Sequence, residues 1–143
     1  MAAGLSLRES DLGRFSAAYN ALCHQWLDDA SLEHAVETDG ELDDGEFTLD
    51  TVRALEQGGP WGQGCAEPSF DGEFKVIGAK MVREDHVRYQ LRTAAGRPLP
   101  AIHFRGAQQA VNAGSVRFVY RPYVNCYNGL EQLELQVLML LAR

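Results

Sequence analysis

The sequence has little cysteine and no long apolar run, and each shortage excludes a class of protein. The three cysteines, Cys23, Cys65 and Cys126, lie far apart and form no CxxC pair. This pattern argues against a disulfide framework or a zinc site and is typical of the reducing cytoplasm. No stretch approaches the roughly 20 apolar residues of a membrane span, and the first residues do not resemble a signal peptide. We therefore expect a cytoplasmic protein that does not enter the membrane.

The sequence also lacks the patterns that hold catalytic metals and nucleotides. Asp43-Asp44 has no histidine neighbour, and His86 follows a lone Asp85, so neither has the spacing of a ligand set. The glycine-rich stretch after Gly58 contains no Gly-Lys-Ser/Thr, so it does not match a phosphate-binding loop. No residues pair as nucleophile and base. We expect no catalytic residue, no metal and no cofactor in this chain.

Charge is distributed unevenly along the 143 residues, which carry a net charge of −7. Residues 1–70 contain 3 Lys/Arg and 14 Asp/Glu, whereas residues 71–143 contain 10 Lys/Arg and 6 Asp/Glu. The overall acidity would argue against nucleic-acid binding, but it conceals a basic second half. An asymmetry of this size is a hint of function.

Apolar spacing predicts two helices in the acidic half. The first spans Ser10 to Leu27, where apolar residues recur at intervals of three and four: Leu12, Phe15, Tyr19, Leu22 and Trp26. The second spans about Thr48 to Gln57, with Leu49, Val52 and Leu55 on one face. A connection rich in glycine and proline follows, and its structural residues are Gly59, Pro60, Trp61, Gly62, Gly64 and Pro68. We expect Trp61 to act as an apolar anchor that holds the helices on the strands.

From residue 71 the apolar period changes to two, which indicates strands. Gly78 can host a bulge that keeps Ala79 and Met81 on the inward face of the first strand. In the second strand, HVRYQLR, the residues Val87, Tyr89 and Leu91 are expected to point inward. Their neighbours are expected to point outward: His86, Arg88, Gln90 and Arg92.

Three more strands follow the second one. In PLPAIHF we expect Ile102 and Phe104 inward and His103 outward, and residues 106–113 have helical composition. In the next strand Arg117 points outward. Asn128-Gly129 then predicts a hairpin turn before a last strand whose inward residues are Leu133, Leu135, Val137 and Met139.

These elements predict an α+β fold in which N-terminal helices pack on a five-stranded OB-like β-barrel. A short helix lies between strands three and four, as in an OB-fold. The expected organisation is residues 1–57 for the helices, 58–70 for the linker and 71–143 for the barrel.

Several motifs resemble those of the RecJ family of single-stranded-DNA-specific exonucleases. GPWGQGCAEPSF is similar to the family segment GPFGxGNPxPxF, VIGAKMVREDHVRYQLR to VxxARxVGKDHLKLRLR, and NCYNGLEQLELQV to NEWNGRRSLQLRL. Met1-Ala2-Ala3-Gly4 resembles the end of the motif that closes the family's DHHA1 domain. The resemblance implies that the chain is the C-terminal piece of a longer protein, with residues 1–57 holding the tail of a DHHA1-like domain.

The resemblance implies a parent enzyme that degrades single-stranded DNA from the 5′ end in repair and recombination, with Mn²⁺ or Mg²⁺ held by a DHH domain absent here. Three departures reduce positive charge at the last hairpin: Leu130 and Glu131 replace a basic pair, and Glu134 replaces a glutamine. They predict weaker binding to the phosphate backbone.

Two functions remain open at this point. The chain is either a single-stranded-DNA-binding module, or a domain that docks the missing catalytic core or a partner such as single-stranded-DNA-binding protein. In the first case outward basic and polar side chains bind DNA beside aromatic residues that stack on bases. The candidate residues are Lys80, His86, Arg88, Gln90, Arg92, His103 and Arg117.

Overall fold

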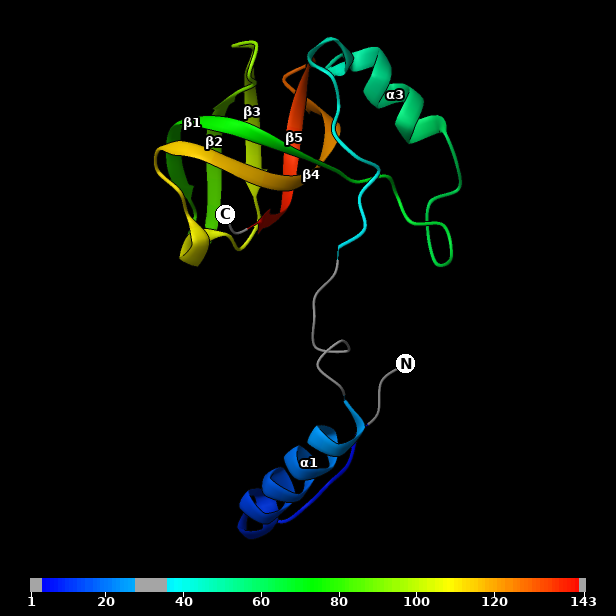
Figure 1. Cartoon of the computed structure of the whole chain (residues 1–143), viewed down its shortest axis with the longest axis vertical. Coiled ribbons are helices and arrows are strands. Elements are labelled where there is room, and N and C mark those ends of the chain that lie inside the picture. Colours follow the sequence, from blue (N-terminus) through cyan, green and yellow to red (C-terminus); the bar gives the residue numbers. More distant parts are fainter. Residues whose placement is uncertain (1–3, 28–35, 142–143) are drawn as a thin grey trace. The chain divides into compact units, whose positions relative to one another are not determined.

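The computed structural model describes residues 4–27 and 36–141, and its contacts divide the chain into two compact units, Met1–Val36 and Glu37–Arg143. Figure 1 shows the elements of each unit. The second unit holds residues 37–57, the connection at 58–70 and the strands together.

The first unit contains a 3-10 turn, η1 (Glu9–Asp11), and helix α1 (Leu12–Trp26). The predicted helix is therefore confirmed. None of its residues is buried, although its apolar stripe is present and the rings of Phe15 and Tyr19 stack with centroids 5.8 Å apart. Residues 1–3 of the DHHA1-like motif lie outside the described residues.

The second unit is a closed five-stranded barrel with the strand order β1-β2-β3-β5-β4. Its strands are β1 (Phe70–Val82), β2 (His86–Arg92), β3 (Pro98–His103), β4 (Gly114–Tyr127) and β5 (Leu130–Leu141). All neighbouring pairs are antiparallel except β3 and β5, which run parallel. The OB-like barrel predicted from the sequence is confirmed.

The long strand β1 bends so that it can serve two neighbours. Its first half pairs with β4 and its second half with β2. The register shifts between Val76 and Gly78, which is the predicted bulge, and Ala79 then lies opposite the inward-facing Tyr89. Met81 keeps the inward parity but is exposed, because the strand has nearly reached its end there.

The inward faces of all five strands form the core, and the sequence alternation predicts those of β1, β2, β4 and β5. The buried residues of these strands include Phe74, Val76, Val87, Tyr89, Leu91, Val116, Phe118, Tyr120, Leu133, Leu135 and Val137. Burying one such side chain is worth about 1.5–3 kcal/mol, so the alternation strongly specifies which face is inside. Met139 is only half-buried.

In β3 the predicted alternation is wrong for His103 and Phe104, although Ile102 is also buried, at 5% exposed. Leu99, Ala101 and His103 face the core, whereas Phe104 is 51% exposed. Residues opposite each other in a ladder share a face, and β3 pairs Ala101 with Tyr89 and His103 with Val87. The segment is apolar on both alternations, so only this pairing decides which one points inward. The predicted helix at 106–113 is reduced to the 3-10 turn η3 (Ala107–Gln109).

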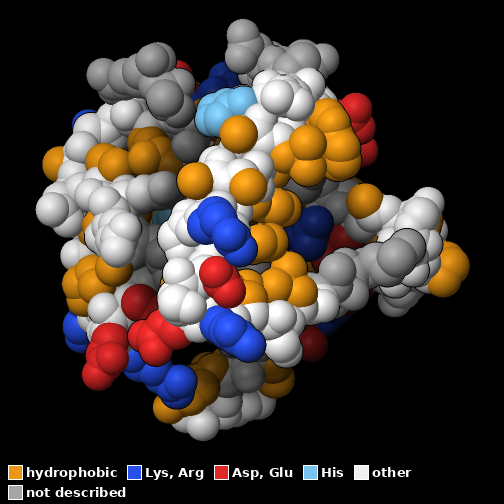
Figure 2. Space-filling model, turned by 90° about the horizontal axis from the view of Figure 1, so that it is seen from below, with side chains coloured by type: hydrophobic (Ala, Val, Ile, Leu, Met, Phe, Trp, Pro, Cys, Tyr) orange, Lys and Arg blue, Asp and Glu red, His pale blue; other side chains and the backbone are white. Residues whose placement is uncertain are grey.

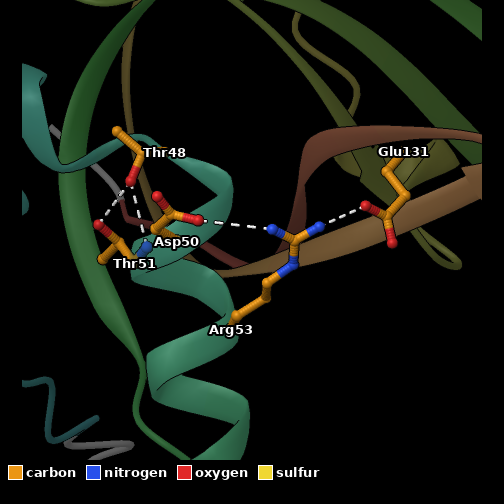
Figure 3. A network of polar contacts seen from close by, with 5 residues as sticks. All are labelled: Thr48, Asp50, Thr51, Arg53 and Glu131. Carbon is orange, nitrogen blue, oxygen red and sulfur yellow. Dashed lines mark hydrogen bonds and ion pairs between the residues drawn. The ribbon is translucent and has the colours of Figure 1, made fainter.

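Helix α3 (Leu49–Gln57) packs against β4 and β5. Thr48 caps the helix, since the Thr51 backbone N–H donates to the Thr48 hydroxyl at 3.1 Å. Val52, on the inner face of the helix, is buried. On its outer side Arg53 pairs with Asp50 and with Glu131 of β5, as Figure 3 shows. The acidic turn η2 (Asp44–Glu46) precedes the helix.

The linker folds back onto the end of α3. The Trp61 indole N–H donates to the Leu55 carbonyl at 3.1 Å, and its ring leaves no free space beside Gly58 and Gly59. The linker turns through a Gly62–Cys65 bridge, in which Gly64 has a positive φ of 85°. The contacts of Trp61 therefore stabilise the helix end, whereas we had expected an anchor on the strands.

Candidate nucleic-acid interface on the outer face of β2

The outer face of β2 presents a row of polar side chains. Arg88, Gln90 and Arg92 are exposed, while Val87, Tyr89 and Leu91 between them are almost fully buried. This is the arrangement that the alternation predicts. The core fixes the outward direction of these polar side chains. If β2 paired with the opposite face inward, Val87, Tyr89 and Leu91 would be exposed to solvent.

The neighbouring strand β1 adds two lysines to this row. Lys80 lies opposite Arg88, and Lys75 lies opposite Arg92. Residues opposite each other have Cβ atoms about 5 Å apart, and like charges in directly opposite positions are destabilising. An anion lying between the members of each pair relieves that repulsion. Lys75 was missed in the sequence analysis, although its place between the inward Phe74 and Val76 already indicated an outward side chain.

Two shallow hollows lie on either side of Gln90 and share the side chains of Gln90 and Pro100. One hollow, of about 270 Å³, is lined also by Ile77, Arg92 and Pro98. The other, of about 290 Å³, is lined also by Lys80 and Arg88. Their exposed walls are aliphatic and proline side chains, and Tyr89 in the second hollow is fully buried. The first hollow therefore combines apolar surface with Arg92, and the second combines it with Lys80 and Arg88.

The cations of this face differ in how they are held. Lys80 has no described ion-pair partner, and the Arg92 guanidinium donates to the Gly96 carbonyl at 3.3 Å. Arg88 lies 3.4 Å from a carboxylate oxygen of Glu134. This contact crosses from β2 to β5, so the local sequence around either residue carries no sign of it.

Glu134 belongs to a buried polar cluster on the outer side of β5. Its Oε2 accepts hydrogen bonds from the Tyr123 hydroxyl at 2.7 Å and the Asn125 side-chain amide at 2.6 Å. Burial, together with the bond to Glu134, raises the pKa of Tyr123 well above its usual range. Tyr123 therefore remains a proton donor to this carboxylate. We had expected Glu134 only to remove positive charge from the hairpin.

The other candidate residues do not join this face. Arg117 lies on β4, where its Nε donates to Asp71 at 2.7 Å and its guanidinium also faces Glu41. The Thr38 hydroxyl, followed by Arg117, holds the pKa of Asp71 below its usual range. Arg117 is thus paired with Asp71 of β1 and with Glu41.

The two candidate histidines are also engaged elsewhere. His103 is 6% exposed and its ring packs directly on Gly106, so the expectation that it points outward is wrong. His86 is half-buried at the start of β2, where its Nδ1 accepts from the Arg105 backbone N–H at 3.2 Å. Its ring stands edge-on to Phe104, with centroids 5.3 Å apart.

Basic side chains do not form a single broad patch elsewhere on the surface that is visible in Figure 2. On that view the coloured Lys and Arg side chains are interspersed with acidic and apolar ones.

Metal ligands do not gather in the described part of the chain. Residues 4–27 and 36–141 contain no group of three or more His, Cys, Asp or Glu side chains that could hold an ion. These residues therefore do not fit a catalytic Mg²⁺ or Mn²⁺. Among the same residues, no helix is long and apolar enough to cross a membrane.

Comparisons with known proteins agree on one family. The family model described as the RecJ OB domain matches residues 38–138. The single-stranded-DNA-specific exonuclease RecJ of Haemophilus influenzae is 35% identical over 143 residues, covering 96% of this chain and 25% of the relative. The enzyme of the same name from Dickeya dadantii is 38% identical over 141 residues, covering 96% and 24%.

A solved structure gives the same fold. The crystal structure of RecJ in complex with Mg²⁺ from Thermus thermophilus superposes with a TM-score of 0.71 at 20% identity, covering 96% of this chain and 21% of that one. A second structure, with Mn²⁺, has the same TM-score. The chain spans about a quarter of the length of the curated relatives that it matches.

Proposed function

We propose that this chain, which belongs to the RecJ family through its OB domain, is the single-stranded-DNA-binding module of a RecJ-type 5′→3′ exonuclease. The catalytic DHH domain and its Mn²⁺ or Mg²⁺ belong to the rest of that enzyme. The proposal includes action in DNA repair and recombination in the cytoplasm.

The observation that supports this proposal is the pairing of cations across β1 and β2, three of which, Lys80, Arg88 and Arg92, line the two hollows. Lys80 with Arg88 and Lys75 with Arg92 form two places for phosphates, one at each end of the row. Gln90 lies between them with apolar surface on both sides. Single-strand binders combine a positive groove along the backbone with aromatic side chains on which bases stack. This face offers the cations, but the expected aromatic residues are not exposed beside them, and the apolar surface comes from Ile77, Pro98 and Pro100.

The same geometry limits the affinity. Only four cations are available, and one of them, Arg88, already has a carboxylate partner. Each phosphate contact contributes roughly 0.7 to the slope of log affinity against log salt for single strands. Three free cations give a slope of about −2, and the net charge of −7 opposes binding. We expect micromolar or weaker affinity.

The test is a titration of a fluorescent oligothymidine at two salt concentrations. We expect the double change Lys80→Ala and Arg92→Ala to weaken binding by about tenfold or more and to flatten the salt slope by about 1.4. Arg53→Ala is the matched control, because Arg53 is an exposed cation on α3 and is paired with acids. Equal binding by the double variant and the parent would show that this face is merely solvated.

A second candidate function is docking to the catalytic part of a RecJ-type enzyme, and helix α1 supports it. Its large apolar side chains are exposed, with Trp26 the most exposed among them, and a stripe of this size is usually covered by a protein surface. If the titration shows no DNA binding, docking becomes the leading function. Single-stranded-DNA-binding protein is the other partner to test.

A further inference from the structure

Glu134 is a carboxylate that points away from the barrel core and yet is buried. Its neighbours Leu133 and Leu135 face inward, so the pleat directs Glu134 to the outer side of β5. Even so, the residue is only 2% exposed. Carboxylates are rarely buried unless they are paired, so the groups around Glu134 determine what it does.

Its two oxygens are held unequally. Oε2 accepts two hydrogen bonds, from Tyr123 and Asn125. Oε1 is buried and has no hydrogen-bond partner, and the Arg88 Nη2 lies 3.4 Å away from it. The Arg88 side chain is 54% exposed, so it is free to reach solvent and remains close to Glu134 by attraction alone.

Arg88 therefore has two competing partners. In the free protein it compensates a buried negative charge, and a phosphate on the β2 face needs the same guanidinium. Removing the partner of a buried charge is costly because the charge is left without solvent. When Arg88 moves from Glu134 to a phosphate, the favourable free energy of the new contact must therefore offset the cost of leaving Glu134 unpaired.

We propose that Glu134 is an affinity-setting residue that withholds Arg88 from single-stranded DNA and so weakens the β2 face as a DNA-binding surface. The inference rests on the proposed function of that face. It makes Arg88 and Arg92 unequal, although they occupy equivalent positions in the alternation. Arg92 contributes fully to binding, while Arg88 contributes little as long as Glu134 is charged.

Glu134→Gln is the sharpest test, because it keeps the shape of the side chain and removes the charge. We expect the E134Q chain to bind oligothymidine about three to ten times more tightly at low salt, with a salt slope steeper by about 0.7. Adding Arg88→Ala should abolish the gain. Glu131→Gln is the matched control, since it removes one exposed charge from the same strand.

A second comparison does not depend on the folding of that variant. In the parent chain Arg88→Ala should weaken binding much less than Arg92→Ala does. Arg88→Ala should instead lower the melting temperature, because it leaves Glu134 buried and unpaired, and adding Glu134→Gln should restore it.

The outcomes separate the two proposals. If Lys80→Ala with Arg92→Ala weakens binding but Glu134→Gln and Glu131→Gln have the same effect, the inference on Glu134 is wrong and the DNA-binding function stands. Equal losses from Arg88→Ala and Arg92→Ala would also overturn the inference. If no variant binds DNA at any salt concentration, both proposals fall. Binding by E134Q alone would support both.

Discussion

His103 places an ionisable ring inside one end of the barrel. Its Nδ1 is buried without a hydrogen-bond partner in the described residues, and burial lowers its pKa below the usual 6.5. A Cβ on Gly106 would lie 2.2 Å from that nitrogen, so the ring has no room to turn away on that side. The folded protein therefore disfavours protonation of His103, whereas the unfolded chain does not.

We expect this difference to make stability fall in mild acid. Between pH 6.5 and the lowered pKa of His103, the unfolded state binds more protons than the folded one, so stability falls as pH falls through this window. Above pH 6.5 the contribution is fully present. Melting curves at pH 7.5 and pH 5 should show a larger loss for the parent than for His103→Leu, which cannot be protonated. Equal losses would mean that other groups cause the acid sensitivity.

The sequence does not predict which arginines of the candidate site are paired with acids. Arg88, Arg92 and Arg117 all alternate with buried residues, and from the sequence they are equivalent outward cations. Their difference arises from acids 46 residues or so away, because Glu134 and Asp71 reach them only after the barrel closes. Local alternation fixes the direction of a side chain, but partners across strands depend on the register.

At the level of elements, prediction succeeds where one face is clearly apolar. Strand β2 and the Asn128-Gly129 hairpin have strong local signals, and both are present, with positive φ at both turn residues. Strand β3 lacks such a signal because Leu99, Ala101 and Ile102 are all apolar. Its phase is decided by pairing with β2. The short segment around η3 is too small for composition to specify a helix.

Helix α3 packs on β4 and β5, and mutation of its N-terminal cap tests how much this helix contributes to stability. Thr48→Ala removes the oxygen that accepts from the Thr51 N–H, so we expect a loss of about 1 kcal/mol in the free energy of unfolding. Thr48→Ser keeps that oxygen and should stay close to the parent. Urea unfolding measures both, and equal stability of all three chains would show that the cap does not matter.

At the scale of the whole molecule, charge and structure divide the chain at different places. The acidic composition extends to residue 70, but the barrel unit begins at Glu37. Acids of the region between them are used inside this unit, as in the contacts of Asp44 with Thr93 and Arg97. The barrel unit is therefore less basic than its strands, and this lowers the DNA affinity that we expect for the proposed face on β1 and β2.

The last prediction concerns catalysis by the isolated chain. RecJ of Thermus thermophilus has been solved with Mg²⁺ and with Mn²⁺, and such ions can orient water and stabilise the leaving oxygen in phosphodiester cleavage. Residues 4–27 and 36–141 of this chain supply no cluster of ligands for them. We expect the purified chain to release no nucleotides from single-stranded DNA in Mn²⁺ or Mg²⁺, even under conditions where it binds the strand. The measurement is release of acid-soluble label over hours, with a chelator as control. Metal-dependent release that the chelator abolishes, and that persists after repeated purification, would contradict the division between a binding module and a catalytic domain elsewhere.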